Sequence, residues 1–182
     1  MGSKPLTFVG MMGCGKSAIG RLTAECLGLP FFDADSEIEK AADMSVAEIF
    51  ENYGEGEFRR GEQRVIERLV EAGPSVIALG GGAFVNDETR SLLKEKSISI
   101  WIDADLETLL ARVLKRPGKR PLLMNGDPRA ILIDLMEKRL PVYRQAELAV
   151  ASSQSSKTKT RDNVLDALHD HLCGQRMVQA GL

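Results

Sequence analysis

Residues Gly10–Ser17, with the sequence GMMGCGKS, match the spacing GxxxxGK[ST] near the start of the chain. Glycines at these positions allow backbone N–H groups to turn inward and approach phosphate oxygens. Lys16 can reach the β- and γ-phosphates of a nucleotide, and the Ser17 hydroxyl can ligate Mg²⁺. We interpret Cys14, inside the loop, as a small filler rather than a catalytic thiol. The segment therefore predicts a site for a nucleoside triphosphate and Mg²⁺.

Two acidic residues, Asp33 and Asp35, follow the apolar pair Phe31–Phe32. If the chain is still extended there, both carboxylates point the same way. One can then serve the Mg²⁺ shell, and the other can accept the proton of a substrate hydroxyl. The alternative is that Asp35 or Ser36 only caps the helix that follows. The phosphate loop upstream favours the catalytic interpretation.

Arg59 and Arg60 lie in the sequence FRRGE, where a helix is expected to begin. A solvated helix surface would explain them equally well. Gly80, Gly81 and Gly82 are more informative, because they follow a buried strand directly. Three glycines there suggest backbone packed close to a ligand, and the alternative is a flexible turn.

The segment 115–123 concentrates four basic residues and two prolines, which predicts an exposed loop. Nucleic-acid binding is one interpretation, but no aromatic residues are interleaved and the chain has a net charge of -2. A lid that closes over a triphosphate agrees better with these features. Arg139, in the sequence KRLPVYR, could be no more than a surface salt-bridge residue.

The elements that must position these groups alternate along the chain. Short apolar runs predict strands, and stretches with helical periodicity predict helices. We expect strands at 6–9, 31–32, 75–79, 98–102 and 148–151, and helices at 16–27, 35–42, 46–52, 57–72, 87–95, 106–114, 129–139 and 164–172. This alternation implies a parallel sheet covered on both faces, with ligands beyond the carboxyl ends of the strands. Every motif falls at such an end or in a long loop, which predicts one active site.

Local signals refine these elements. Gly28 is a plausible stop for the first helix, and Pro141 should interrupt or bend the helix that contains Arg139. The segment 152–160 is polar and is expected to be mobile. The tail 173–182 carries no motif and is expected to be disordered.

Composition narrows the class of protein. The chain has 182 residues, of which 43% are hydrophobic and 27% charged, as in a single soluble domain. Its three cysteines show no CxxC spacing, which argues against a disulfide framework and a zinc site. No segment is apolar enough to cross a bilayer. We therefore expect a cytoplasmic protein without nucleic-acid or membrane partners, or an organellar one if a transit peptide has been removed.

Together these residues resemble the shikimate kinase family over about 6–150. Five blocks appear in the family's order: GMMGCGKS, FFDADSEIE, EFRRGE, ALGGGA, and the pair RPLL and RLPVYR. The resemblance implies a three-layer α/β/α P-loop kinase fold with a central parallel sheet of about five strands. It implies a single domain over 1–182, with the phosphate loop at 10–17, a substrate-binding segment at 33–62 and a lid at 112–126.

The resemblance also implies an activity. ATP would donate its γ-phosphoryl group to the 3-hydroxyl of shikimate, giving shikimate 3-phosphate and ADP on the route to chorismate and the aromatic amino acids. Asp35 would bind the shikimate hydroxyls and act as the base, and Lys16 and Arg120 would complete the catalytic set. Ser17 would bind Mg²⁺, and Asp33 would support the ion through water.

The remaining roles also follow from the resemblance. The substrate site would consist of Asp35, Arg59, Gly80, Gly81, Gly82 and Arg139. The ATP site would consist of Gly13, Cys14, Gly15, Lys16, Ser17, Ala18, Arg112, Arg120 and Ser155. A carboxylate suits the arginines chemically, because guanidinium is its planar, bidentate partner. We expect a monomer.

Two alternatives remain open at this stage. The first keeps the chemistry and changes the acceptor, as in a gluconate kinase-like enzyme, although the FRR and GGG blocks argue against it. The second is a non-catalytic binding protein resembling shikimate kinase. Loss of Lys16, Asp35 or the substrate arginines would favour that second alternative, and all of them are present.

Overall fold

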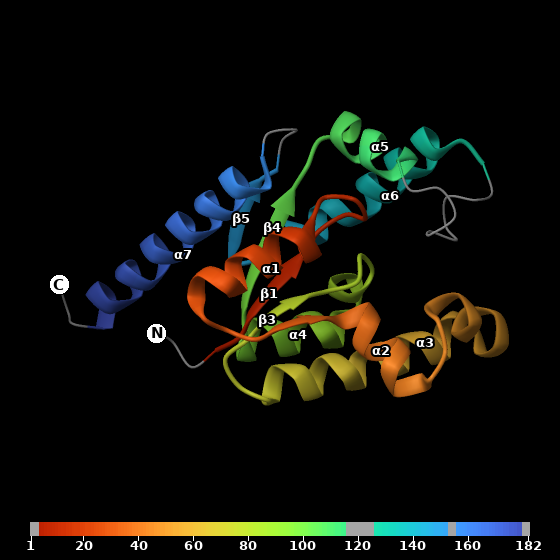
Figure 1. Ribbon diagram of the computed structural model, residues 1–182, viewed down its shortest axis with the longest axis horizontal. Helices are drawn as coiled ribbons and strands as arrows, with labels where there is room; N and C mark the ends of the chain where they lie inside the picture. The colour runs from red at the N-terminus through yellow and green to blue at the C-terminus, as the bar shows by residue number, and fades with distance from the viewer. Residues whose placement is uncertain (1–3, 116–125, 153–155, 180–182) are drawn as a thin grey trace.

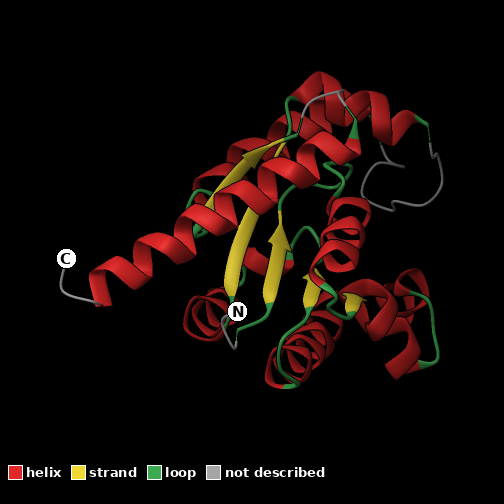
Figure 2. Ribbon diagram, turned by 60° about the vertical axis from the view of Figure 1, so that its left-hand side comes forward, coloured by secondary structure: helices red, strands yellow, loops and turns green. Residues whose placement is uncertain are grey.

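A five-stranded parallel sheet forms the centre of the molecule (Figure 1). The computed structural model describes residues 4–115, 126–152 and 156–179. The strands are β1 (Leu6–Val9), β2 (Phe31–Asp33), β3 (Val76–Ala78), β4 (Ile98–Asp103) and β5 (Leu148–Ala151). Their order in space is β2-β3-β1-β4-β5, and Figure 2 shows them side by side and pointing the same way. The predicted parallel sheet is confirmed.

Helices cover both faces of this sheet, which gives three layers. They are α1 (Lys16–Leu27), α2 (Ala34–Ala42), α3 (Val46–Glu71), α4 (Asp87–Lys96), α5 (Leu106–Leu114), α6 (Pro128–Tyr143) and α7 (Lys157–Gln179), with a 3-10 turn η1 (Ala83–Val85). α1 and α7 pack together on one face, and α3 and α4 pack together on the other. Strand side chains such as Phe8, Ile77 and Ile100 are fully buried because both faces are covered. No helix in the described part of the chain is long and apolar enough to cross a membrane.

The order of the strands determines where in the sheet the site lies. β1 lies at the centre and pairs with β3 on one side and β4 on the other. The chain therefore reverses direction across the sheet at β1, and in open parallel sheets ligands bind in the crevice that such a reversal leaves at the carboxyl ends. The phosphate loop follows β1, and the triple glycine follows β3.

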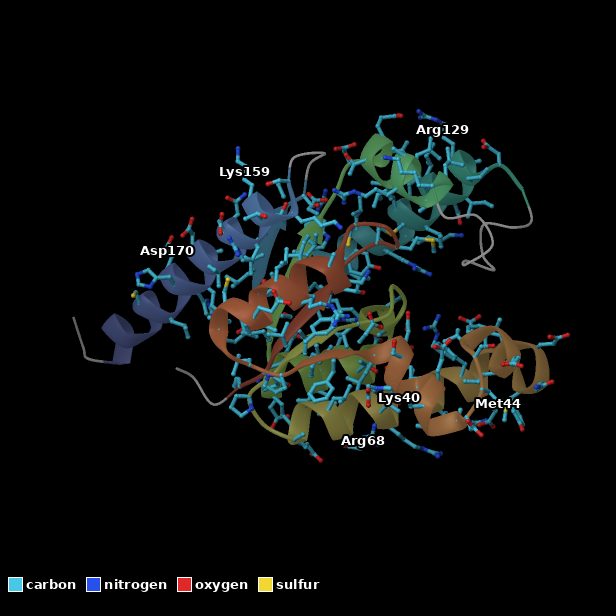
Figure 3. All side chains as sticks on the ribbon, viewed as in Figure 1. Lys40, Met44, Arg68, Arg129, Lys159 and Asp170 are labelled. Carbon is cyan, nitrogen blue, oxygen red and sulfur yellow. The ribbon has the colours of Figure 1, made fainter. Side chains whose placement is uncertain are left out.

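The α2–α3 unit projects to one side of these carboxyl ends (Figure 1). Glu37 accepts from Lys40 on α2 itself at 2.7 Å, and its other oxygen lies 3.6 Å from Arg68, which links α2 to α3. Figure 3 shows Lys40 and Arg68 on this side of the molecule, with Arg129 across from them, near α5. α3 begins with a capping box between Ser45 and Glu48, a motif that satisfies the first free N–H groups of a helix.

A kink at Gly54, with φ 77 and ψ 174, divides α3 into two helices, in agreement with the separate helices expected at 46–52 and 57–72. Two other expectations about the helices need correction. α6 continues through Pro141 to Tyr143, because a proline so near the end costs only one of the last hydrogen bonds. α7 runs from Lys157 to Gln179, so the prediction of disorder is wrong for 173–179, and 157–160 is helical.

Two glycines in α3 should respond oppositely to alanine. Gly54 has a backbone conformation that only glycine adopts readily, and a side chain there would meet nothing within 4 Å. Gly54→Ala should therefore destabilise the fold by about 1–3 kcal/mol through backbone strain alone. Gly56→Ala, at an uncrowded position without positive φ, should stabilise it by about 0.4–1 kcal/mol. Denaturant unfolding of both variants checks this, and equal signs would contradict it.

Candidate active site

The phosphate loop joins β1 to α1 and leaves the start of α1 open to an anion. Gly15 precedes the helix with φ 108 and has no side chain to cap it, so the first N–H groups remain available. Lys16 is buried, and its Nζ donates to the carbonyl oxygens of Gly10 and Met11 at 2.9 and 3.0 Å. Gly10 lies so close to β4 that a Cβ there would stand 2.7 Å from the carbonyl oxygen of Ile102.

Two side chains hold the phosphate loop in place by hydrogen bonds to one of its backbone carbonyl oxygens. Arg112 donates to the Cys14 carbonyl oxygen at 2.8 Å, and the Ser152 hydroxyl donates to the same oxygen at 3.1 Å. Cys14 itself is fully buried and free of any disulfide, in agreement with its interpretation as a filler. Arg112 was expected in the ATP site, and the structure shows it on the loop carbonyls and on the wall of the cavity that the loop lines. Ser152, directly after β5, was missed because its hydroxyl is one of several in a polar stretch.

One cavity of about 550 Å³ is lined by the predicted phosphate-loop and acidic residues, whereas Arg59, Gly82 and Arg139 do not line it. Its walls include loop residues Gly13 and Lys16, the acids Asp33 and Asp35, and the turn at Gly81. Gly15, Ser17, Ala18 and Gly80 also line it. The expectation of a single site at the carboxyl edge of the sheet agrees with this arrangement.

The backbone that places Asp33 and Asp35 at the cavity has a conformation different from the one expected. β2 ends at Asp33 and α2 begins at Ala34, so Asp35 lies in the first turn of a helix. The premise of an extended chain through Asp35 is therefore wrong. Asp33 accepts a hydrogen bond from Ser17 Oγ at 2.6 Å. The first turn of α2 instead carries Asp35 towards Gly80. A Cβ on Gly80 would lie 2.8 Å from Oδ1 of Asp35. Neither Asp35 nor Ser36 caps α2, since the capping position is Asp33.

Burial raises the pKa of the Asp35 carboxyl, and the nearby Asp33 carboxylate raises it further. Lys16 and Arg59 act in the opposite direction. A carboxylate with a raised pKa holds a proton more strongly, which suits a group that must accept one from a hydroxyl.

The triple glycine is a place of very close packing. A Cβ on Gly82 would stand 2.6 Å from Nη2 of Arg59, and one on Gly81 would stand 3.3 Å from Nη1 of Arg139. The glycines therefore make room for the polar side chains of the site itself. The sequence of the triple glycine predicted backbone close to a ligand. The structure shows side chains of the site in that space.

Arg59 is held by two glutamates on its own helix. Its Nη1 donates to Glu62 at 2.7 Å, and its Nε and Nη2 both face the same oxygen of Glu55 at 3.3 and 3.1 Å. Glu55 is 67% exposed and Glu62 only 3%. Neither was singled out from the sequence, since acids three or four residues from an arginine are the usual pattern of a solvated helix.

Glu62 is unusual because one of its two oxygens, Oε1, is buried without a hydrogen-bond partner among the described residues. Burial raises the pKa of this carboxyl, and Arg59 opposes the shift. The unpartnered oxygen faces Gly80, at 2.8 Å from the position of a Cβ there. Glu62 thus orients Arg59 at the cost of a partly unsatisfied buried charge.

Some predicted residues cannot be placed. Arg120 and Ser155 lie outside the described residues, as does most of the lid predicted at 112–126. Their proposed contacts with ATP therefore remain predictions.

The fold and site define a P-loop phosphotransferase: a parallel sheet with a phosphate loop after its central strand, a cavity lined by that loop and two acids, and two arginines beside the triple-glycine turn. A family model described as shikimate kinase matches residues 12–169. This chain belongs to the shikimate kinase family.

Individual relatives agree. A shikimate kinase from Brucella canis is 50% identical over 100% of this chain and 90% of its own length. One from Rhodopseudomonas palustris is 49% identical over 95% of this chain and 85% of its own. The structure of a shikimate kinase from Acinetobacter baumannii in complex with shikimate superposes with a TM-score of 0.89 at 34% identity, covering 93% of this chain and 94% of that one. A gluconokinase from Sinorhizobium meliloti, with a TM-score of 0.67 at 18% identity over 96% of each chain, shares only the fold.

Glu62 gives a prediction about stability and pH. Because its pKa in the folded chain is raised above the ordinary 4.5, the folded state holds its proton at pH values where the unfolded state has lost it. The associated stability is complete below pH 4.5 and is lost as pH rises through the folded pKa. Glu62→Gln cannot ionise, so its Tm should gain on that of the wild type as pH rises through this window.

The control for this measurement is Glu57→Gln, which removes an exposed carboxylate from the same helix. Thermal scans from acid to neutral pH compare the three proteins. A difference between Glu62→Gln and wild type that stays constant across the window would contradict the prediction.

Proposed function

We propose that this chain transfers the γ-phosphoryl group of ATP to the 3-hydroxyl of shikimate, giving shikimate 3-phosphate and ADP. The observation that carries the proposal is the placement of Asp35, Arg59 and Arg139 around the triple-glycine turn, next to the phosphate loop. Asp35 supplies a proton acceptor, and the two arginines supply the positive charge that binds the carboxylate of a small acid. Membership in the shikimate kinase family supports the same acceptor.

At the donor end, the free N–H groups at the start of α1 receive the phosphates. Lys16 leaves the carbonyl oxygens of Gly10 and Met11 and turns to the β- and γ-phosphates. Ala18 and Arg112 line the same cavity, and Arg120 and Ser155 are proposed to contact ATP as well. Phosphoryl transfer depends mainly on such positioning and neutralisation of charge, because the protein contributes little covalent chemistry.

Ser17 and Asp33 suit a magnesium ion. Their oxygens lie 2.6 Å apart in the cavity, and hydroxyl and carboxylate oxygens are the ligands that Mg²⁺ takes up in phosphate sites. Ser17 would bind the ion directly and Asp33 through water. The bound ion would neutralise charge on the β- and γ-phosphate oxygens.

At the acceptor end, Arg59 and Arg139 clamp the carboxylate of shikimate, and the backbone of Gly81 and its neighbours forms the wall. The Nε and Nη2 edge of Arg59 is the bidentate face of a guanidinium, and Glu55 occupies it in this structure. The exposed Glu55 is displaced when the substrate carboxylate arrives, whereas the buried Glu62 stays and keeps Arg59 in place.

Asp35 binds the reacting hydroxyl and takes its proton as the oxygen attacks the γ-phosphorus. The raised pKa of Asp35 helps it to hold that proton, and the Lys16 charge opposes the rise. We propose a monomer as the working unit. The proposed location is cytoplasmic, or organellar if a transit peptide has been removed.

Purified protein with ATP and Mg²⁺ tests the function directly. A panel of small hydroxy acids should give phosphorylated product with shikimate and none with gluconate, assayed by ADP release and by mass of the product. Turnover of gluconate in place of shikimate would establish the alternative acceptor. Absence of turnover with every acid, despite binding of shikimate, would indicate a non-catalytic binding protein.

Asp35→Asn isolates the role of the base. Loss of the proton acceptor should lower kcat by about 10²–10⁴-fold, while KM for ATP stays unchanged because Asp35 serves only the acceptor. Asp43→Asn is the matched control: Asp43 ends the same helix with φ 51, a conformation that asparagine also tolerates. Steady-state kinetics on both variants check this, and an unaltered kcat in Asp35→Asn would remove Asp35 from the role of base.

A further inference from the structure

The sequence of the triple-glycine turn permits two backbone conformations. The Ala83 N–H donates to the Gly80 carbonyl oxygen at 3.2 Å, which closes a β-turn with Gly81 and Gly82 at its centre. Gly82 has φ -94 and ψ -16, the values of a type I turn. A type II turn differs by a flip of the central peptide and requires positive φ at this position, which glycine adopts freely. Glycine at both central positions therefore permits either turn.

One hydrogen bond from another element resolves that choice. The hydroxyl of Tyr143, the last residue of α6, donates to the carbonyl oxygen of Gly81. This carbonyl belongs to the central peptide of the turn, the unit that would flip. Tyr143 is fully buried at 0% exposure, so water does not replace the bond. A phenylalanine would fill the same volume next to Trp101 but could not hold the peptide.

The orientation of this peptide matters for the acceptor site. A trans peptide is planar, so the Gly82 N–H points away from Tyr143 when the Gly81 carbonyl points towards it. The turn lies between the two arginines of the clamp: Gly81 is next to Arg139, and Gly82 is next to Arg59. A flipped peptide would present a carbonyl oxygen where the type I turn presents an N–H donor, and a carbonyl oxygen repels a carboxylate.

We propose that Tyr143 is a positioning residue for acceptor binding, which holds the Gly81–Gly82 peptide in the type I turn and so keeps the wall of the acceptor site ready for an anion. The inference rests on the proposed function. Tyr143 also lies next to Arg139, one turn earlier on α6, so the same phenol links one arginine of the clamp to the wall between the two arginines.

The chemistry of the phenol suits this role. Burial raises the pKa of Tyr143 to about 12, although the Arg139 charge opposes the shift. The hydroxyl therefore stays protonated and able to donate at any pH at which the protein works.

Tyr143→Phe tests the proposal, and the chain's only other tyrosine supplies the control. Loss of the hydroxyl should raise KM for shikimate about two- to tenfold, the value of one hydrogen bond that pre-organises a site. KM for ATP and Tm should change little. Tyr53, on α3, is 57% exposed, and Tyr53→Phe should leave every constant unchanged. An unchanged KM for shikimate, or an equal rise in both KM values, would overturn the proposal.

A second measurement tests the proposal on the wild-type protein alone, and the variant adds to it where it folds. Wild-type protein labelled with ¹⁵N-glycine should show one Gly82 amide resonance without exchange on the μs–ms timescale, because one turn is populated. Folded Tyr143→Phe should show exchange or a second Gly82 resonance. Exchange at Gly82 in the free wild type would overturn the proposal. Absence of shikimate turnover by the wild type would instead refute the proposed function, so the two failures are distinguishable.

Discussion

The close approach of two backbones at the carboxyl edge of the sheet is the constraint on which the site depends. The phosphate loop leaves β1 and the triple-glycine turn leaves the neighbouring β3. The turn comes so near the loop that a Cβ on Gly81 would lie 3.6 Å from the Met12 nitrogen and 3.7 Å from the Gly10 oxygen. Donor and acceptor sites are therefore joined by backbone, and their separation is set by the spacing of two adjacent strands. Larger side chains at these glycines would force the phosphate loop and the triple-glycine turn apart.

This approach has an electrostatic cost. Glu62 is buried and Asp35 lies on the cavity wall, and desolvation by the surrounding protein raises the pKa of both carboxyls. Arg59 compensates part of it, yet one Glu62 oxygen has no partner among the described residues. A buried ion pair is often no more stabilising than an apolar pair of similar volume, so these charges agree better with a functional role than with a contribution to stability. The site holds its arginine in position before the substrate arrives, which lowers the ordering cost of binding.

Much of this could be predicted from local sequence. The phosphate loop, the five strands and the glycines after β3 each depend on short-range spacing, and the structure agrees with them. Asp35 was assigned to the site through a wrong premise, because the end of β2 falls one residue before α2 begins and periodicity does not resolve so short a boundary. Glu62 and Tyr143 could not have been found in this way. Their roles come from contacts with glycines that lie far away in the chain, and helical spacing gives the same pattern for a solvated acid or a core aromatic.

The hydrogen bond from Ser152 to the Cys14 carbonyl oxygen has a consequence for how the protein becomes active during its synthesis. The two residues are 138 positions apart, and Ser152 follows the last strand of the sheet. A nascent chain that has already folded β1, α1 and α5 has Arg112 behind its phosphate loop, but it lacks the second hydrogen bond until Ser152 has left the ribosome. Synthesis proceeds at roughly 5–20 residues per second, so the interval between the loop and Ser152 lasts for seconds. The support behind the loop is therefore completed late in the synthesis of the chain.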